Sequence, residues 1–233
     1  MFNEILYRPI FNALVLLYEY ASWQDLGIAI ILLTIIIRII LFPLFHVAMR
    51  QQYAMQRLQP HVKKIQNDHK DSREKQAQAL MALYKQHGVN PFSGILLMLA
   101  QLPIFLALFW VFRDGITIES LGQLYSFVSP PEEITHSFFG LIDLQGRSII
   151  LVGVAAIAQY FQGRLTLTPQ SERIAKQMVM LGPALTVAIM SFLPAAIALY
   201  WLASSTFSIF QQVIIMKSIK NDEQQPPANS KTA

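Results

Sequence analysis

A single charged residue, Arg38, lies in the middle third of an apolar run that extends from residue 26 to residue 47. About 20 consecutive apolar residues are enough to span the hydrocarbon core of a bilayer. An arginine at the bilayer centre costs roughly 2.5 kcal/mol or more, so we expect Arg38 to face water, a partner or the protein interior rather than lipid. Thr34 lies one helical turn before it, on the same face. A guanidinium in this position would bind an anion, for instance a carboxylate of a ligand.

Polar residues also recur in the last apolar run of the chain, from residue 195 to 216. Helical spacing places four of them on one stripe and three beside it: Tyr200, Ser204, Ser208 and Gln211, then Trp201, Ser205 and Gln212. Hydroxyl groups in transmembrane helices often do no more than bond to neighbouring helices. Several on one face, together with an arginine inside the membrane, instead indicate a hydrated concave surface. Gln101 and Gln159, in two other runs, either join this surface or hold helices together.

None of the apolar runs contains an Asp or Glu residue. Arg38 therefore lacks the buried counter-ion that would be its simplest structural explanation. This absence favours an open, hydrated groove, in which the carboxylate of a passing ligand meets the charge of the guanidinium.

No pattern in the sequence indicates catalysis. His46 and Ser93, near the ends of two apolar runs, could form the pair of an intramembrane protease, but neither lies in a nucleophile motif and no third group orients them. The five histidines lack metal-ligand spacing, there is no cysteine, and there is no Walker loop or GxGxxG motif. We therefore expect a protein that is not an enzyme and that uses no cofactor or metal.

Composition indicates the class of fold. Hydrophobic residues make up 54% of the 233 residues and charged residues 14%, compared with a typical charged share of about 25% in soluble domains. Because the apolar residues are gathered in runs, we expect an all-α membrane protein with five transmembrane helices. The predicted spans are residues 26–47, 91–112, 148–163, 173–192 and 195–216. Pro43 should bend the first span near its far end.

The segments between the spans complete the predicted organisation. Residues 1–25 have the broken apolar pattern of a helix that lies in the external membrane interface, and a poorly ordered leader is the alternative. Residues 50–88 predict a cytoplasmic antiparallel helical hairpin, whose second helix would begin with a capping box of Asp71 and Glu74. The remaining segments are an external loop, a short cytoplasmic loop and a disordered cytoplasmic tail: residues 113–147, 164–172 and 217–233.

The distribution of charge predicts the orientation in the membrane. The hairpin, residues 164–176 and the tail contain fourteen Lys and Arg residues, whereas residues 1–25 and 113–147 contain three Lys or Arg and eight Asp or Glu. Since positive residues stay on the cytoplasmic side, we expect the hairpin and the C-terminus in the cytoplasm and the N-terminus outside. The start of the chain has no pattern of a cleaved signal peptide, so we expect it to be retained. No internal repeat of the kind found in secondary transporters is visible.

Four segments together resemble the YidC-type membrane protein insertases, a bacterial family with relatives in mitochondria and chloroplasts. They are TIIIRIILFPL around Arg38, MALYKQHGVNPFSG at the end of the hairpin, LLMLAQLPIFLALFW in the second span and LPAAIALYWLASSTFSIFQQ in the last span. The similarity extends from about residue 5 to residue 217 and includes the order and the lengths of the elements.

The resemblance implies a five-span core with a hydrated groove that is open to the cytoplasm and to lipid and closed outside. Members of the family move short hydrophilic segments of nascent membrane proteins across the bacterial inner membrane and release the adjacent apolar segment into lipid. Arg38 matches the groove arginine of the family and Thr34 its functional threonine. Trp201 follows Tyr200 where many relatives have a second tyrosine. The expected substrate-binding groove consists of Thr34, Arg38, Gln101, Tyr200, Trp201, Ser204, Ser205 and Ser208.

The resemblance also implies partners. The family acts in the lipid bilayer on nascent membrane proteins, alone or beside the Sec translocon, and has no nucleotide site of its own. The basic hairpin 50–88 is either a solvated structural element or a docking surface for substrate, ribosome or signal-recognition machinery. We expect a short form of the family without its large external domain, a weakly basic tail that does not bind ribosomes strongly, and no specific nucleic acid as a ligand.

Two other functions remain open on the sequence alone. A small anion channel or transporter would use Arg38 as an anion site, and a pore accessible from both sides would support this function. A membrane-protein assembly scaffold would use the hairpin as its binding surface, with a merely structural Arg38. Tolerance of Arg38→Ala in an insertion assay would support the scaffold.

Overall fold

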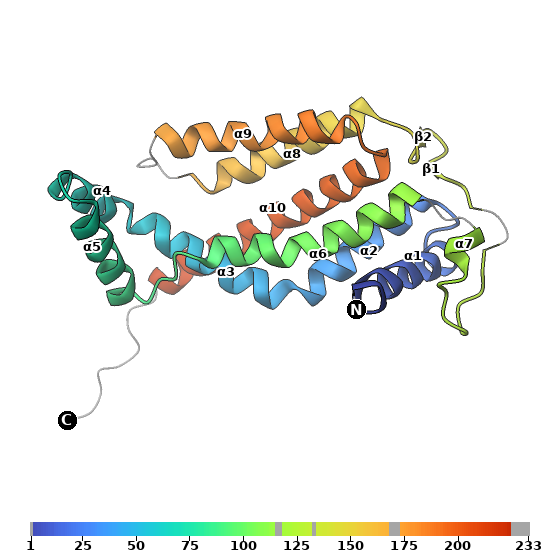
Figure 1. Ribbon diagram of the computed structural model, residues 1–233, viewed down its shortest axis with the longest axis horizontal. Helices are drawn as coiled ribbons and strands as arrows, with labels where there is room; N and C mark the ends of the chain where they lie inside the picture. Colours follow the sequence, from blue (N-terminus) through green and yellow to red (C-terminus); the bar gives the residue numbers. More distant parts are fainter. Residues whose placement is uncertain (1, 115–117, 132–133, 168–172, 225–233) are drawn as a thin grey trace, which may run out of the picture.

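The computed structural model describes residues 2–114, 118–131, 134–167 and 173–224, and it is helical almost throughout (Figure 1). The elements in chain order are a π-helical turn η1 (Asn3–Tyr7), α1 (Arg8–Tyr20), α2 (Leu26–Ile40), α3 (Phe42–Arg57), α4 (Gln59–Asp68), α5 (Arg73–Gln86), α6 (Ser93–Asp114), α7 (Ile118–Leu121), β1 (Ser137–Phe138), β2 (Ile142–Asp143), α8 (Ile149–Leu165), α9 (Arg173–Met190) and α10 (Ala195–Gln224).

The hydrophobic core lies where α1, α2, α6 and α10 meet. Phe11, Ile30, Leu108 and Ile197, one from each of these helices, are all at most 2% exposed. Helix α8 packs on α10, and α9 packs on α8, which places α9 at the edge of the molecule (Figure 1). Since each fully buried large apolar side chain stabilises by about 1.5–3 kcal/mol, the burial of α1 ties this helix firmly to α2 and α6.

A sharp bend separates α2 from α3. The two helix axes meet at 67° across Leu41, and Pro43 lies in the first turn of α3. Proline lacks a backbone N–H, and its ring clashes with the carbonyl group four residues before it, so the helix cannot continue straight through this position. The predicted bend at Pro43 is confirmed, whereas a first membrane span over residues 26–47 stays a prediction.

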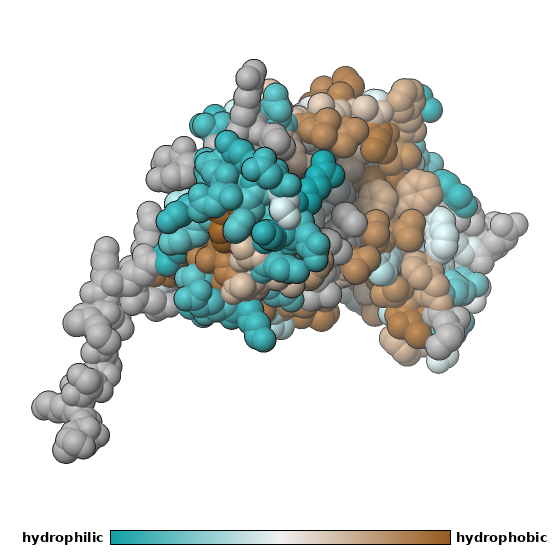
Figure 2. All heavy atoms as spheres, turned by 60° about the vertical axis from the view of Figure 1, so that its left-hand side comes forward, coloured by the Kyte–Doolittle hydropathy of each residue, from teal (hydrophilic) through white to brown (hydrophobic). Residues whose placement is uncertain are grey.

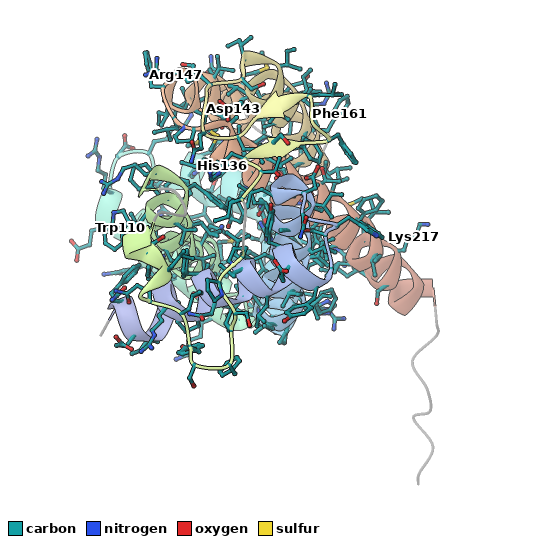
Figure 3. The ribbon with its side chains drawn as sticks, turned by 90° about the vertical axis from the view of Figure 1, so that its right-hand side faces the viewer. Trp110, His136, Asp143, Arg147, Phe161 and Lys217 are labelled. Carbon is teal, nitrogen blue, oxygen red and sulfur yellow. The ribbon has the colours of Figure 1, made fainter. Side chains whose placement is uncertain are left out.

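The segment after α6 folds over the N-terminal ends of α2 and α10. Strands β1 and β2 pair antiparallel, and the carbonyl groups of Leu144 and Gly146 accept hydrogen bonds from the first backbone N–H groups of α10, Ala196 at 3.0 Å and Ala195 at 2.8 Å. Asp25 caps α2 by accepting from Ile28 N and also accepts from Phe139 N. These bonds satisfy N–H groups that a helix start leaves without an intrahelical partner. Figure 3 views this end, with His136 and Asp143 on the strand pair.

Helices α4 and α5 lie at the opposite end of the molecule and pack through a small apolar cluster of Leu58, Val62, Leu83 and Val89 (Figure 1). Hydrophilic residues cover this end, whereas hydrophobic residues cover much of the adjoining surface (Figure 2).

The start of α5 and the end of α10 differ from the prediction. Ser72, not Asp71, caps α5 by accepting from Lys75 N, because Ser72 is the residue with extended backbone just before the helix. At the other end of the chain, α10 continues to Gln224, so the tail predicted from residue 217 begins as helix, and residues 225–233 lie outside the described residues.

One helix among the described residues, α10 over Ala195–Ile219, is long and apolar enough to cross a membrane. The bent pair of α2 and α3 counts as a second if it forms one broken span. The apolar parts of α6, α8 and α9 are shorter: Leu99–Arg113, Ile149–Leu165 and Lys176–Met190. The fold is therefore helical with one or two clear spans, and the five-span topology stays a prediction.

Candidate functional site

Arg38, in the last turn of α2, is 8% exposed and is held by a serine of α10. Its Nε donates to Ser204 Oγ at 3.0 Å, its Nη2 donates to the same oxygen, and its Cζ lies 4.6 Å from the centre of the Phe45 ring. Its Nη1 is buried and has no hydrogen-bond partner. Among the residues that the structure describes, no carboxylate pairs with Arg38. The guanidinium therefore keeps both its charge and a free donor.

A cavity of about 620 Å³ opens beside Arg38. Its walls come from α2, α3, the start of α4, α6, α8, α9 and α10. The uncharged lining consists of glutamines, serines, methionines and a few other apolar residues, and Arg38 is the one charged side chain among the described lining residues. Because no other described lining residue carries a charge, Arg38 dominates the electrostatic potential of the cavity.

Six of the eight predicted groove residues line this cavity: Arg38, Gln101, Trp201, Ser204, Ser205 and Ser208. The other two, Thr34 and Tyr200, are at most 2% exposed and are not among its lining residues. The Thr34 hydroxyl donates to Ile30 O at 2.6 Å, and Tyr200 Oη accepts from Gln101 Nε2. Thr34 and Tyr200 are therefore better placed to support the residues that line the cavity than to contact a ligand directly.

Helix α3 also lines this cavity, although none of its residues was predicted to belong to the site. Because the bend at Leu41 turns α3 across the cavity, Phe45, Met49, Gln52, Met55 and Gln56 line it, although residues from 50 onward were predicted to lie in the hairpin. The helical spacing of the glutamines on α3 was the available signal, but it does not reveal the direction of the bend.

Helices α8 and α9 form the opposite wall. Gln159 lines the cavity and also accepts a hydrogen bond from Thr186 of α9, so it both joins the polar surface and holds two helices together. Gly182 and Pro183 face the same cavity.

The residues considered for proteolysis are not arranged as a catalytic pair. Ser93 Oγ donates to Asn90 O at 3.0 Å, and the His46 ring lies 5.7 Å from the Phe42 ring with no partner for its buried Nδ1. The geometry gives this activity no support.

Comparison with known proteins identifies the family of the chain. The model of the family described as 60Kd inner membrane protein matches residues 17–223. A curated membrane protein insertase YidC of Chlorobaculum tepidum is 33% identical over 224 residues, which are 95% of this chain and 37% of the relative. Another from Magnetococcus marinus is 35% identical over 199 residues, which are 85% of this chain and 34% of the relative.

The fold also resembles a solved structure. An active YidC insertase crystal structure superposes with a TM-score of 0.64 at 27% identity, covering 89% of this chain and 46% of that one. The chain spans a little more than a third of the length of the curated relatives. Since the family model matches most of the sequence, the chain belongs to the 60Kd inner membrane protein family.

Proposed function

We propose that this protein is a membrane protein insertase and chaperone of the bacterial inner membrane. The observation that carries the proposal is Arg38, a buried guanidinium without a carboxylate partner among the described residues, which lines a cavity of about 620 Å³. The similar proteins named membrane protein insertase YidC support the same activity.

Arg38 acts on the hydrophilic segment of the substrate. An acidic residue in that segment is attracted to the guanidinium, and no other charged side chain among the described lining residues competes with this attraction. Moving one elementary charge through a membrane potential of 100 mV is worth about 2.3 kcal/mol, which assists the outward passage of an acidic segment. Ser204, Ser205 and Ser208 keep this part of the cavity polar.

The apolar segment of the substrate leaves along the apolar part of the cavity lining. Phe45, Met49, Met178 and Trp201 border the cavity with apolar surface. Transfer of the segment into lipid gains about 0.8 kcal/mol for each buried CH₂ group, so insertion proceeds without nucleotide hydrolysis.

The arrangement in the membrane follows from the same proposal. The bent pair of α2 and α3 forms the first span, and α6, α8, α9 and α10 form the other four. The α4–α5 pair and the C-terminus are cytoplasmic, and the N-terminus and the segment from 113 to 147 are external. The protein acts alone or with the Sec translocon, and the α4–α5 pair is a docking surface for the ribosome or signal-recognition machinery.

Reconstitution tests this function. Purified protein in lipid vesicles should insert a single-span substrate with a short acidic N-terminal segment, measured as protease protection of that segment, well above protein-free vesicles. Anion flux through the same vesicles without insertion would support a channel instead. Failure of both would favour an assembly scaffold.

A further inference from the structure

Seven glutamines line the cavity beside Arg38. They are Gln52, Gln56, Gln59, Gln101, Gln159, Gln162 and Gln212. A glutamine amide carries donors and an acceptor but no charge. A site that needed only water and a positive charge would not require this number of amides.

Five of these amides bond to no residue that the structure describes. Gln101 bonds to Tyr200, and Gln159 bonds to Thr186. The others form no hydrogen bond with the parts of the chain that the structure describes: Gln52, Gln56, Gln59, Gln162 and Gln212. Gln212 is 4% exposed, and its Oε1 is buried without a donor.

These five amides surround the cavity. Gln52 and Gln56 come from α3, Gln59 begins α4, Gln162 comes from α8 and Gln212 from α10. Methionines lie among them on α3 and α9: Met49, Met55 and Met178. Methionine is unbranched and adapts to neighbours of many shapes. The lining therefore offers hydrogen bonds on several sides but no rigid pocket for a particular side chain.

One ligand class fits such a surface. An extended polypeptide presents N–H and C=O groups at every residue, whatever its sequence, and these groups are costly to bring into a membrane unpaired. Glutamine amides pair with both kinds of group.

We infer that these five glutamines hydrogen-bond the main chain of an extended polypeptide segment in the cavity. Arg38 then favours an acidic side chain, while the glutamines accept any backbone. The inference rests on the proposed insertase function and names what part of the substrate its site recognises.

Backbone chemistry separates this role from others. Two synthetic single-span peptides have the same side chains, and in one of them several amide links of the acidic segment are replaced by esters. An ester lacks the N–H donor and is a weaker acceptor. Vesicles contain the wild-type chain or the triple variant Gln52→Met, Gln56→Met and Gln212→Met, which keeps side-chain length and removes the amides. Gln123→Met, in the segment after α7 and outside the cavity lining, is the matched control.

The triple variant should insert the all-amide peptide roughly fivefold more slowly than the wild type, as expected for the loss of one or two hydrogen bonds. The ester peptide should respond less than about twofold to the same substitutions, and Gln123→Met should change neither rate. An equal loss for both peptides would overturn the inference, because the glutamines would then act through water or folding. No loss for either peptide would overturn it too. If wild-type vesicles insert the all-amide peptide no faster than protein-free vesicles, the proposed function fails, and the inference fails with it.

Discussion

Arg38 and Arg8 differ in whether a carboxylate neutralises the guanidinium charge. Arg8 pairs with Glu4 at 3.2 Å and lies over the Tyr125 ring, so its charge has a local partner. Arg38 has a serine hydroxyl and the face of Phe45, neither of which neutralises it. Burying a charge without a counter-ion is costly, and a ligand carboxylate beside the guanidinium would offset this cost. This cost is the physical reason to assign Arg38 a ligand.

Ser204 should position Arg38. Ser204→Ala removes the acceptor of two guanidinium donors, so we expect the free energy of unfolding to fall by about 1 kcal/mol. Thermal unfolding in detergent measures this change. Ser205→Ala is the matched control, since Ser205 is equally buried and bonds to no described residue. Equal losses for the two variants would contradict a specific role of Ser204.

Among the elements, the β1–β2 pair closes the end of the molecule away from α4 and α5. Phe138 lies so close to α2 that a Cβ atom at Gly27 would come 2.1 Å from its Cδ2. Only glycine permits this approach, and the strand pair is thereby held on the helix.

Gly27→Ala should destabilise the protein by about 1–3 kcal/mol, because overpacking displaces Phe138. Unfolding in detergent, followed by near-UV circular dichroism, measures the loss. Gly153→Ala on α8 is the control, since no heavy atom lies within 4 Å of its added Cβ. The double variant Gly27→Ala, Phe138→Ala should lose less than Gly27→Ala alone if the clash is the cause, and an additive loss would exclude that cause.

His136 should make this closure sensitive to pH. Burial lowers the pKa of His136 below its usual value near 6.5, although the carboxylate of Asp143 opposes the shift. Gln145 Nε2 lies 3.2 Å from His136 Nε2, so the amide donates to an unprotonated nitrogen. As pH falls through 6.5, the imidazole is protonated in the unfolded chain before it is protonated in the folded protein. The free energy of unfolding is therefore highest above pH 6.5 and declines below it.

Melting temperatures between pH 7.5 and pH 5.5 test this dependence. The wild type should lose more stability on acidification than His136→Gln, which cannot take up the proton. Parallel pH profiles of the two proteins would show that His136 does not contribute.

At the scale of the whole molecule, the sequence predicts features that depend on neighbouring residues, such as a bend at a proline. It does not predict the direction in which one helix packs against another. Proline chemistry is local, so the bend at Pro43 followed from the sequence. The direction of that bend depends on packing against α6 and α10, and it decides that Gln52 and Gln56 face the cavity. Helical spacing found the polar stripe of α10, but it could not show that Tyr200 is absent from the cavity lining and bonds to Gln101.

The absence of cysteine from the chain makes the proposed topology directly testable. Asp71→Cys, between α4 and α5, should react with a membrane-impermeant maleimide only from the cytoplasmic side. Leu141→Cys, at the exposed tip of the strand pair, should react only from outside. Labelling of both positions from one side would contradict the orientation.

The most direct test of the whole account is the insertion rate of a single-span substrate with an acidic N-terminal segment, in vesicles that contain the wild type, Arg38→Lys or Arg38→Ala. Arg147→Ala, at an exposed position near the strand pair, is the matched control. We predict that Arg38→Ala slows insertion roughly tenfold or more, that Arg38→Lys retains a large part of the rate, and that Arg147→Ala has no effect. Insertion by Arg38→Ala at the wild-type rate would contradict the claim that Arg38 is the electrostatic centre of the site.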